Sequence, residues 1–383
     1  MSIKLMATSL LLTLASTTAL AQQTGTMVGR TPGSAAANNG FRVVRVIPPP
    51  PTCASAAEVP AAASNAPVLP GLVFSRMELT CLRHSDGRFE ELPKIAGGVL
   101  SPNGTELAYW NLQTHELHLR SIANSSDTIL DSLPDLTPKT MFWSEKGRAL
   151  VYPVNNANPL RYRVLDIDSG KRSLVDRGVT RILGAPDPAH LLAMAANAVE
   201  RIRVSDGKHE VLAIANSPTD AQYSPSGALL GILVPGPGGR ETVDDDTPDC
   251  TGGNFALIVQ KTATKHLLEI PFPEAFDNVL DFSFSPGDDT LAISFGRVGC
   301  DYPGDVARVY VVPLSNLALT PLSPADRLSV QAHWSPDGKT IVYSDYTGSD
   351  TPLIAVDLRS GKAARLTNPG QNGPDTFLAW RQP

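Results

Sequence analysis

Four aspartates gather in one short segment of the chain, where their carboxylates could bind a cation or a basic partner. They are Asp244, Asp245, Asp246 and Asp249. Their spacing does not match the calcium loop that has glycine at its sixth position and glutamate at its twelfth. We therefore interpret the segment as a solvated acidic loop that contributes to binding. We expect no cofactor, with Ca²⁺ as the alternative for this loop.

Histidine is the second residue type that could support catalysis or hold a metal. His115 and His118 are three positions apart on an expected strand, so their side chains would point to opposite faces. His333 is expected on the innermost strand of its sheet, near a central channel, and is a weak candidate metal ligand. The aligned inner positions hold no second histidine; they are Val99, Phe142, Gln222, Ser283 and Ala379. Since one ligand does not make a metal site, we predict neither a bound metal nor a catalytic residue.

The four cysteines suggest two disulfide bonds, which can be drawn in three ways. Cys250 and Cys300 lie in corresponding loops of neighbouring repeats, so we expect them to pair with each other. Cys53 is then left to pair with Cys81, and that bond would tie the N-terminal segment to the first strands. Free buried thiols are the alternative for some of the four.

The elements that hold these residues are short strands joined by a recurring turn of the Ser-Pro-Asp-Gly type. Its clearest copy is Ser335-Pro336-Asp337-Gly338. Proline presets φ, while Asp, Asn and Gly tolerate the left-handed backbone that a tight turn needs. The first position of this turn recurs at residues 101, 144, 185, 224, 285 and 335. A second turn, of the type Asp357-x-x-Ser360-Gly361-Lys362, follows in several repeats, so each repeat should contain four strands.

This pattern predicts an all-β fold, namely a β-propeller with four-stranded antiparallel blades. The turns define six complete repeats. Phe377–Trp380 has the pattern of a further innermost strand, and the strands within Leu72–Leu92 lack an inner strand before them. Together the N- and C-terminal strands would close a seventh blade and remove the open edges of the ring. We favour seven blades, with six as the alternative.

The N-terminal residues indicate export from the cytoplasm. Lys4, the apolar stretch Leu5–Leu14 and the small residues Ala19 and Ala21 are typical of a signal peptide. We assign this signal peptide to residues 1–21, with cleavage after Ala21. No later apolar run is long enough to span a bilayer, so we expect a periplasmic or secreted protein.

Residues 22–70 are rich in proline and alanine, which predicts a flexible lead-in before a propeller domain of residues 71–383. A single strand at Phe41–Val46 is the alternative within this lead-in. The net charge of −6 offers no basic surface to a phosphate backbone, so nucleic acid is not an expected partner. We expect a monomer.

The two turns and the following Arg365-Leu366-Thr367 resemble the WD-like repeat of TolB-type propellers. The resemblance covers residues 71–383 and is strongest over residues 333–367. It implies a propeller that serves as a platform for protein docking. The family's α/β domain cannot be built by residues 22–70, and its six blades differ from the seven favoured here. The chain also lacks the Gly-x-Ser-x-Gly motif of related propeller peptidases, so peptidase activity is not expected.

Two long connections between expected strands should emerge on the same face of the propeller. They are Val234–Asn254, which contains the four aspartates, and Gly296–Asp305. Long loops held by a rigid scaffold commonly carry function. We therefore predict a non-catalytic binding scaffold whose partner is an envelope or secreted protein. The alternative is a metal-dependent lyase or lactonase with its site at the central channel.

Overall fold

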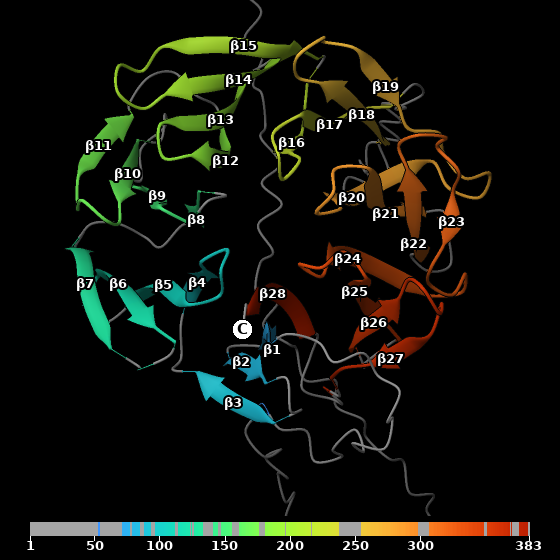
Figure 1. Cartoon of the computed structure of the whole chain (residues 1–383), viewed down its shortest axis with the longest axis horizontal. Coiled ribbons are helices and arrows are strands. Elements are labelled where there is room, and N and C mark those ends of the chain that lie inside the picture. Colours follow the sequence, from blue (N-terminus) through green and yellow to red (C-terminus); the bar gives the residue numbers. More distant parts are fainter. Residues whose placement is uncertain are drawn as a thin grey trace, which may run out of the picture. The chain divides into compact units, whose positions relative to one another are not determined.

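The computed structural model describes Cys53 and most of residues 71–381, which belong to one compact unit (Figure 1). The gaps within that range are residues 77–78, 85–87, 93–95, 112–113, 123, 125, 133–140, 145–146, 155–160, 176–180, 196, 216, 237–253, 298–305, 348–350, 368 and 370–374. The regular elements described are all strands. Across these residues we find no helix long and apolar enough to cross a membrane. The predicted signal peptide and, apart from Cys53, the predicted lead-in lie outside the described residues.

Most strands form separate four-stranded antiparallel sheets, which confirms the predicted blade architecture. One sheet is β4 (Ala96–Leu100), β5 (Glu106–Asn111), β6 (Glu116–Ser121) and β7 (Asp127–Ser132). The next is β8 (Phe142–Trp143), β9 (Ala149–Pro153), β10 (Tyr162–Asp166) and β11 (Arg172–Val175). Then come β12 (Arg181–Asp187), β13 (His190–Ala195), β14 (Ala198–Arg203) and β15 (His209–Ile214). The fourth consists of β16 (Asp220–Tyr223), β17 (Leu229–Pro235), β18 (Phe255–Lys261) and β19 (Leu267–Glu269).

The fifth separate sheet combines strands from the two ends of the chain. Its order is β28 (Asp375–Arg381), β1 (Gly71–Arg76), β2 (Leu79–Arg83) and β3 (Phe89–Leu92). β28 and β1 are antiparallel, and Leu72 lies opposite Trp380. This pairing confirms the prediction that the C-terminal strand completes a sheet begun by the N-terminal strands. We call the β28–β1 pairing the seam.

The number of separate blades differs from the prediction. Among the described residues there are five separate four-stranded sheets, not seven or six, and the other eight strands form one sheet. Those strands are β20 (Asn278–Phe284), β21 (Thr290–Arg297), β22 (Val306–Pro313), β23 (Thr320–Pro321), β24 (Leu328–Trp334), β25 (Thr340–Tyr346), β26 (Leu353–Asp357) and β27 (Ala363–Arg365). The physical reason is a single parallel pair, Ala307 with Leu328, which joins the antiparallel groups β20–β23 and β24–β27.

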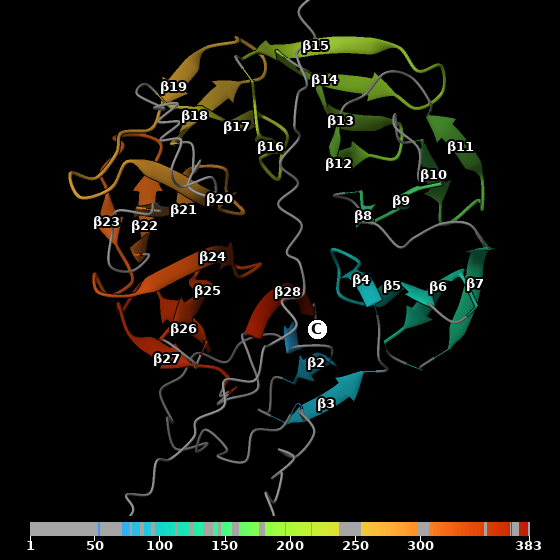
Figure 2. The ribbon, with the colours of Figure 1, turned by 180° about the vertical axis from the view of Figure 1, so that it is seen from behind.

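The hydrophobic core lies between the faces of neighbouring sheets, which surround a common centre (Figure 2). For example, Val73 of the seam sheet packs with Leu107 of β5, and Trp110 of β5 packs with Trp143 of β8. The two halves of the eight-stranded sheet also pack face to face, through residues such as Val309 and Tyr343. Each sheet therefore buries its apolar faces against two neighbours, as a propeller requires.

The turns of the Ser-Pro-Asp-Gly type contain a buried serine, and so does the copy at Ser144, which lacks the proline. In the turn at Ser335, the hydroxyl oxygen accepts a hydrogen bond from the backbone N–H of Thr340 at 2.9 Å. The same bond, from the residue five positions later, forms at Ser101, Ser144, Ser224 and Ser285. Gly338 follows in the left-handed region with φ of 68°. The turn thus satisfies a buried polar group while it reverses the chain.

A disulfide bond joins Cys53 to Cys81 of β2, as predicted, with 5.4 Å between the two Cα atoms. This bond attaches a residue of the predicted lead-in to the seam sheet. Cys250 and Cys300 lie outside the described residues, so their predicted pairing stays a prediction.

Candidate functional site

A cavity of about 530 Å³ lies where inner strands of three different sheets meet Ser-Pro turns. The strands β4, β8 and β16 each come first in their sheets and face the common centre (Figure 1). We call this cavity the axial pocket. Every lining residue is uncharged: Gly98, Val99, Leu100, Pro102, Phe142, Trp143, Gln222, Tyr223 and Pro225.

The residue before the turn serine helps to place the pocket wall. Trp143 precedes Ser144, and its indole N–H donates a hydrogen bond to the backbone carbonyl of Val99 on the neighbouring inner strand, at 3.1 Å. Trp334 repeats this contact with the carbonyl of Ser283, at 3.2 Å. A tryptophan in this position therefore links successive inner strands as well as filling the space between sheets.

His333, the predicted weak metal candidate, lies on β24 as expected and stacks on the ring of Phe377 of β28, with centroids 4.4 Å apart. The ring keeps some exposure, but the surrounding chain removes enough water to lower the pKa of His333 to about 4. It is therefore neutral at pH 7. Within the described ranges, no group of three or more His, Cys, Asp or Glu side chains could hold a metal ion.

Asp281 is a residue near His333 that the sequence reasoning did not single out. Its carboxylate accepts hydrogen bonds from the backbone N–H of Gln331, at 2.8 Å, and from the hydroxyl of Ser294, at 2.8 Å. Gln331 has a φ of 59°, an uncommon value for a residue with a side chain. Burial raises the pKa of Asp281 in spite of these bonds. Asp281 thus supports the irregular backbone that precedes His333.

The other two histidines do not form a site together. His115 lies in the turn before β6, with a φ of 56°, rather than on a strand as predicted. His118 lies on β6, where its ring contacts carboxylate oxygens of Asp127, at 3.0 Å, and Glu116, at 3.3 Å. It also stacks on Tyr109. Burial, together with the hydrogen bond to Asp127, raises the pKa of Tyr109 to about 12.

The predicted binding residues Asp244, Asp245, Asp246 and Asp249 lie outside the described residues. Their flanking strands are described: β17 ends at Pro235 opposite Phe255, where β18 begins. The other long connection leaves β21 after Arg297 and enters β22 at Val306. Both connections join the second strand of a sheet to the third, and the two sheets share one core cluster. By strand direction, both leave the end opposite to the Ser-Pro turns and to the axial pocket.

No family model matches the chain, and no curated protein matches its sequence. Solved structures with a similar fold include an oligogalacturonate lyase in complex with manganese, at 12% identity, with 74% of this chain and 84% of that chain covered and a TM-score of 0.53. A prolyl endopeptidase is similar at 13% identity, with 78% and 50% covered and a TM-score of 0.52. TolB from Acinetobacter baumannii is similar at 14% identity, with 84% and 86% covered and a TM-score of 0.46. The first two similarities support the propeller fold alone.

Proposed function

We propose that this chain is an exported, non-catalytic β-propeller that binds another protein of the cell envelope. The observation that carries the proposal is topological. The two long connections leave the same end of two sheets that pack against each other, between β17 and β18 and between β21 and β22. A rigid scaffold that holds two long loops together suits recognition of a partner.

The charge of the longer connection indicates the kind of partner. Asp244, Asp245, Asp246 and Asp249 fall within it, so this end of the propeller should attract a basic surface. A bond between Cys250 and Cys300 would link the two connections and reduce the entropy lost on binding. Export by the signal peptide of residues 1–21 would place the protein in an oxidising compartment where such a bond persists.

The test is capture of partner proteins from an envelope extract at several salt concentrations. Replacing the four aspartates with asparagine should weaken capture and reduce its salt dependence, while thermal unfolding stays unchanged. A matched control is Gln222→Arg, which adds a charge to the axial pocket at the opposite end. If the control loses capture and the asparagine variant keeps it, the partner binds at the pocket end.

The axial pocket supports a second candidate, the binding of an uncharged apolar group. Its rings and prolines offer apolar contacts, and Gln222 is an exposed amide among them. A pocket of a few hundred Å³ with mainly apolar walls suits a small ligand. In this case Gln222→Arg should abolish binding, because a charge would then be buried by the ligand.

A lyase or lactonase working at the channel is the catalytic alternative. The described channel histidine, His333, packs its ring on Phe377 instead of joining other ligand side chains. Metal analysis of the purified protein distinguishes the two functions. Stoichiometric metal that is lost on His333→Ala would support the enzyme and contradict the binding proposal.

A further inference from the structure

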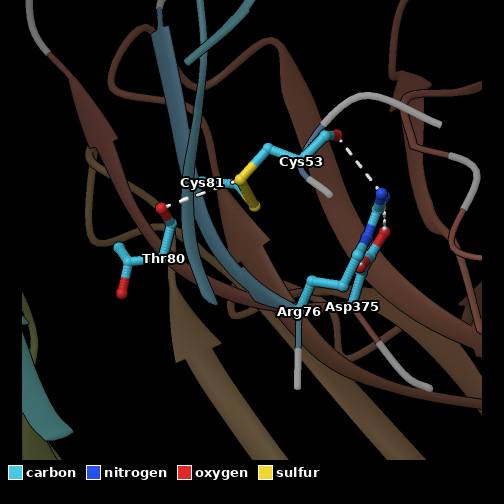
Figure 3. The surroundings of a disulfide bond; sticks show 5 residues. All are labelled: Cys53, Arg76, Thr80, Cys81 and Asp375. Atoms are coloured by element: carbon cyan, nitrogen blue, oxygen red, sulfur yellow. Dashed lines mark hydrogen bonds and ion pairs between the residues drawn. A yellow bond between two sulfur atoms is a disulfide. The ribbon is translucent and has the colours of Figure 1, made fainter. Parts of the chain in front are cut away.

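The disulfide bond lies beside a buried ion pair at the seam, as Figure 3 shows. Arg76 is the last residue of β1 and lies opposite Asp375, the first residue of β28. Its Nε and Nη2 atoms donate to the two carboxylate oxygens of Asp375, at 2.7 and 2.8 Å. Both side chains are fully buried. A bidentate pair of this kind is strong and directional, but neither charge can lose its partners without a large cost.

Cys53 also contacts this pair. The Nη1 atom of Arg76 donates to the backbone carbonyl of Cys53, at 3.2 Å. The position of that carbonyl is fixed in turn by the bond between Cys53 and Cys81. The disulfide bond to β2 thus positions a carbonyl oxygen that accepts a hydrogen bond from the Arg76 guanidinium. The same guanidinium holds β28 against β1.

The seam also protects the disulfide bond. Cys81 is fully buried and Cys53 is 3% exposed, and both belong to a core cluster with Phe74 of β1 and Phe377 of β28. A reductant therefore reaches the sulfur atoms only when this part of the sheet opens. If the bond also stabilises the closed seam, its reduction favours opening by the same free energy by which opening favours reduction.

We propose that the Cys53–Cys81 bond, Arg76 and Asp375 form a redox-sensitive latch on the seam. A dithiol reductant supplies the two electrons: its thiolate attacks one sulfur, and the other cysteine leaves as a thiolate. The second thiol of the reductant then displaces the first cysteine. The protein gains two thiols and the reductant becomes a disulfide. The covalent link between Cys53 and β2 is then lost, so the carbonyl that accepts from Arg76 is no longer tied to the sheet by the disulfide bond.

The first test is the rate of reduction by a dithiol under native conditions, measured in the full chain. Asp375→Asn should speed reduction about tenfold or more, as expected when a charge-assisted hydrogen bond no longer opposes local opening. Asp131→Asn is the matched control, because it alters a carboxylate that pairs with an arginine, Arg163, outside the seam sheet. Rates are compared after each variant's stability has been measured. If the reduction rate of each variant rises only in proportion to its loss of stability, the disulfide is reduced through global unfolding. The proposed latch is then wrong.

The second test needs no charge variant and covers the case in which Asp375→Asn does not fold. Amide hydrogen exchange is measured in the oxidised chain and in a Cys53→Ser, Cys81→Ser variant. Protection should fall at the seam pairs, such as Leu72 with Trp380, and stay constant in β13. Unchanged protection at the seam, or an equal loss in β13, would overturn the proposal.

Discussion

Asp288 occupies the turn position that glycine holds elsewhere, and its carboxylate accepts a hydrogen bond from the hydroxyl of Ser224 in the neighbouring sheet, at 2.8 Å. Its φ of 60° matches those of the turn glycines Gly104 and Gly338. The backbone N–H of Ser226 donates to the same carboxylate, at 3.3 Å. One side chain therefore joins two turns, at the cost of a left-handed backbone.

The first prediction concerns this bridge. Asp288→Ala should lower the free energy of unfolding by about 1–3 kcal/mol, because Ser224 loses a partner and alanine is strained at this φ. Asp288→Gly loses the same bond but relieves the strain, so its loss should be smaller. Urea unfolding measures both. Equal stability of Asp288→Ala and the unaltered chain would show that the bridge contributes nothing.

The second prediction concerns close packing between sheets. A side chain at Gly231 of β17 would collide with the ring of Phe282 of β20. Gly231→Ala should therefore cost about 1–3 kcal/mol, the usual result of overfilling a packed core. Gly184→Ala is the control, since no atom lies within 4 Å of the added methyl group. Its effect in the same urea titration should stay within about 1 kcal/mol.

The third prediction concerns the seam. Deleting residues 375–383 removes β28 and leaves the edge of β1 unpaired. Arg76 then lacks its carboxylate partner in a buried position. We expect a sharply lower melting temperature or aggregation, because an exposed strand edge pairs with other chains. Calorimetry and light scattering give the result, and an unchanged melt would mean that the ring does not depend on this strand.

The fourth prediction concerns pH. Burial lowers the pKa of His333 to about 4 from an ordinary value of 6.5, so the unfolded chain takes up a proton at higher pH than the folded chain. The contribution to stability is thus complete above pH 6.5 and lost as the pH falls toward 4, and it amounts to at most about 3–4 kcal/mol. His333→Gln should flatten the pH dependence of urea unfolding in this window. If the free energy of unfolding of the variant changes with pH as steeply as that of the unaltered chain, the lowered pKa of His333 is contradicted.

The sequence predicted those parts of the fold that depend on neighbouring residues. The serine of each turn accepts a hydrogen bond from a backbone N–H five positions later. The turns at Ser335 and Ser101 therefore depend on local residues and could be predicted from the sequence pattern. The copy at Ala185 lacks the hydroxyl, yet its strand still begins a four-stranded sheet. The pairing of Cys53 with Cys81 was predicted by elimination, and the structure contains it.

Contacts between residues far apart in the chain could not be predicted from the local sequence pattern. Nothing local to Ala307 or Leu328 indicates that their strands pair and join two antiparallel groups into one sheet. The role of Asp281 depends on Gln331, which lies 50 positions further along the chain and has an unusual backbone conformation. Likewise, the uncharged lining of the axial pocket combines residues from three sheets that are remote in the chain.

The pairing of Arg76 with Asp375 also fixes an order of events during folding. The two residues are 299 positions apart, whereas the strands of most sheets follow one another directly along the chain. Contacts between near neighbours form quickly, and contacts that close a long loop form slowly. While the chain is being made, its earlier sheets can assemble one after another into an open arc. The first strands must wait in that arc, with β1 unpaired on one side, until the last strand arrives.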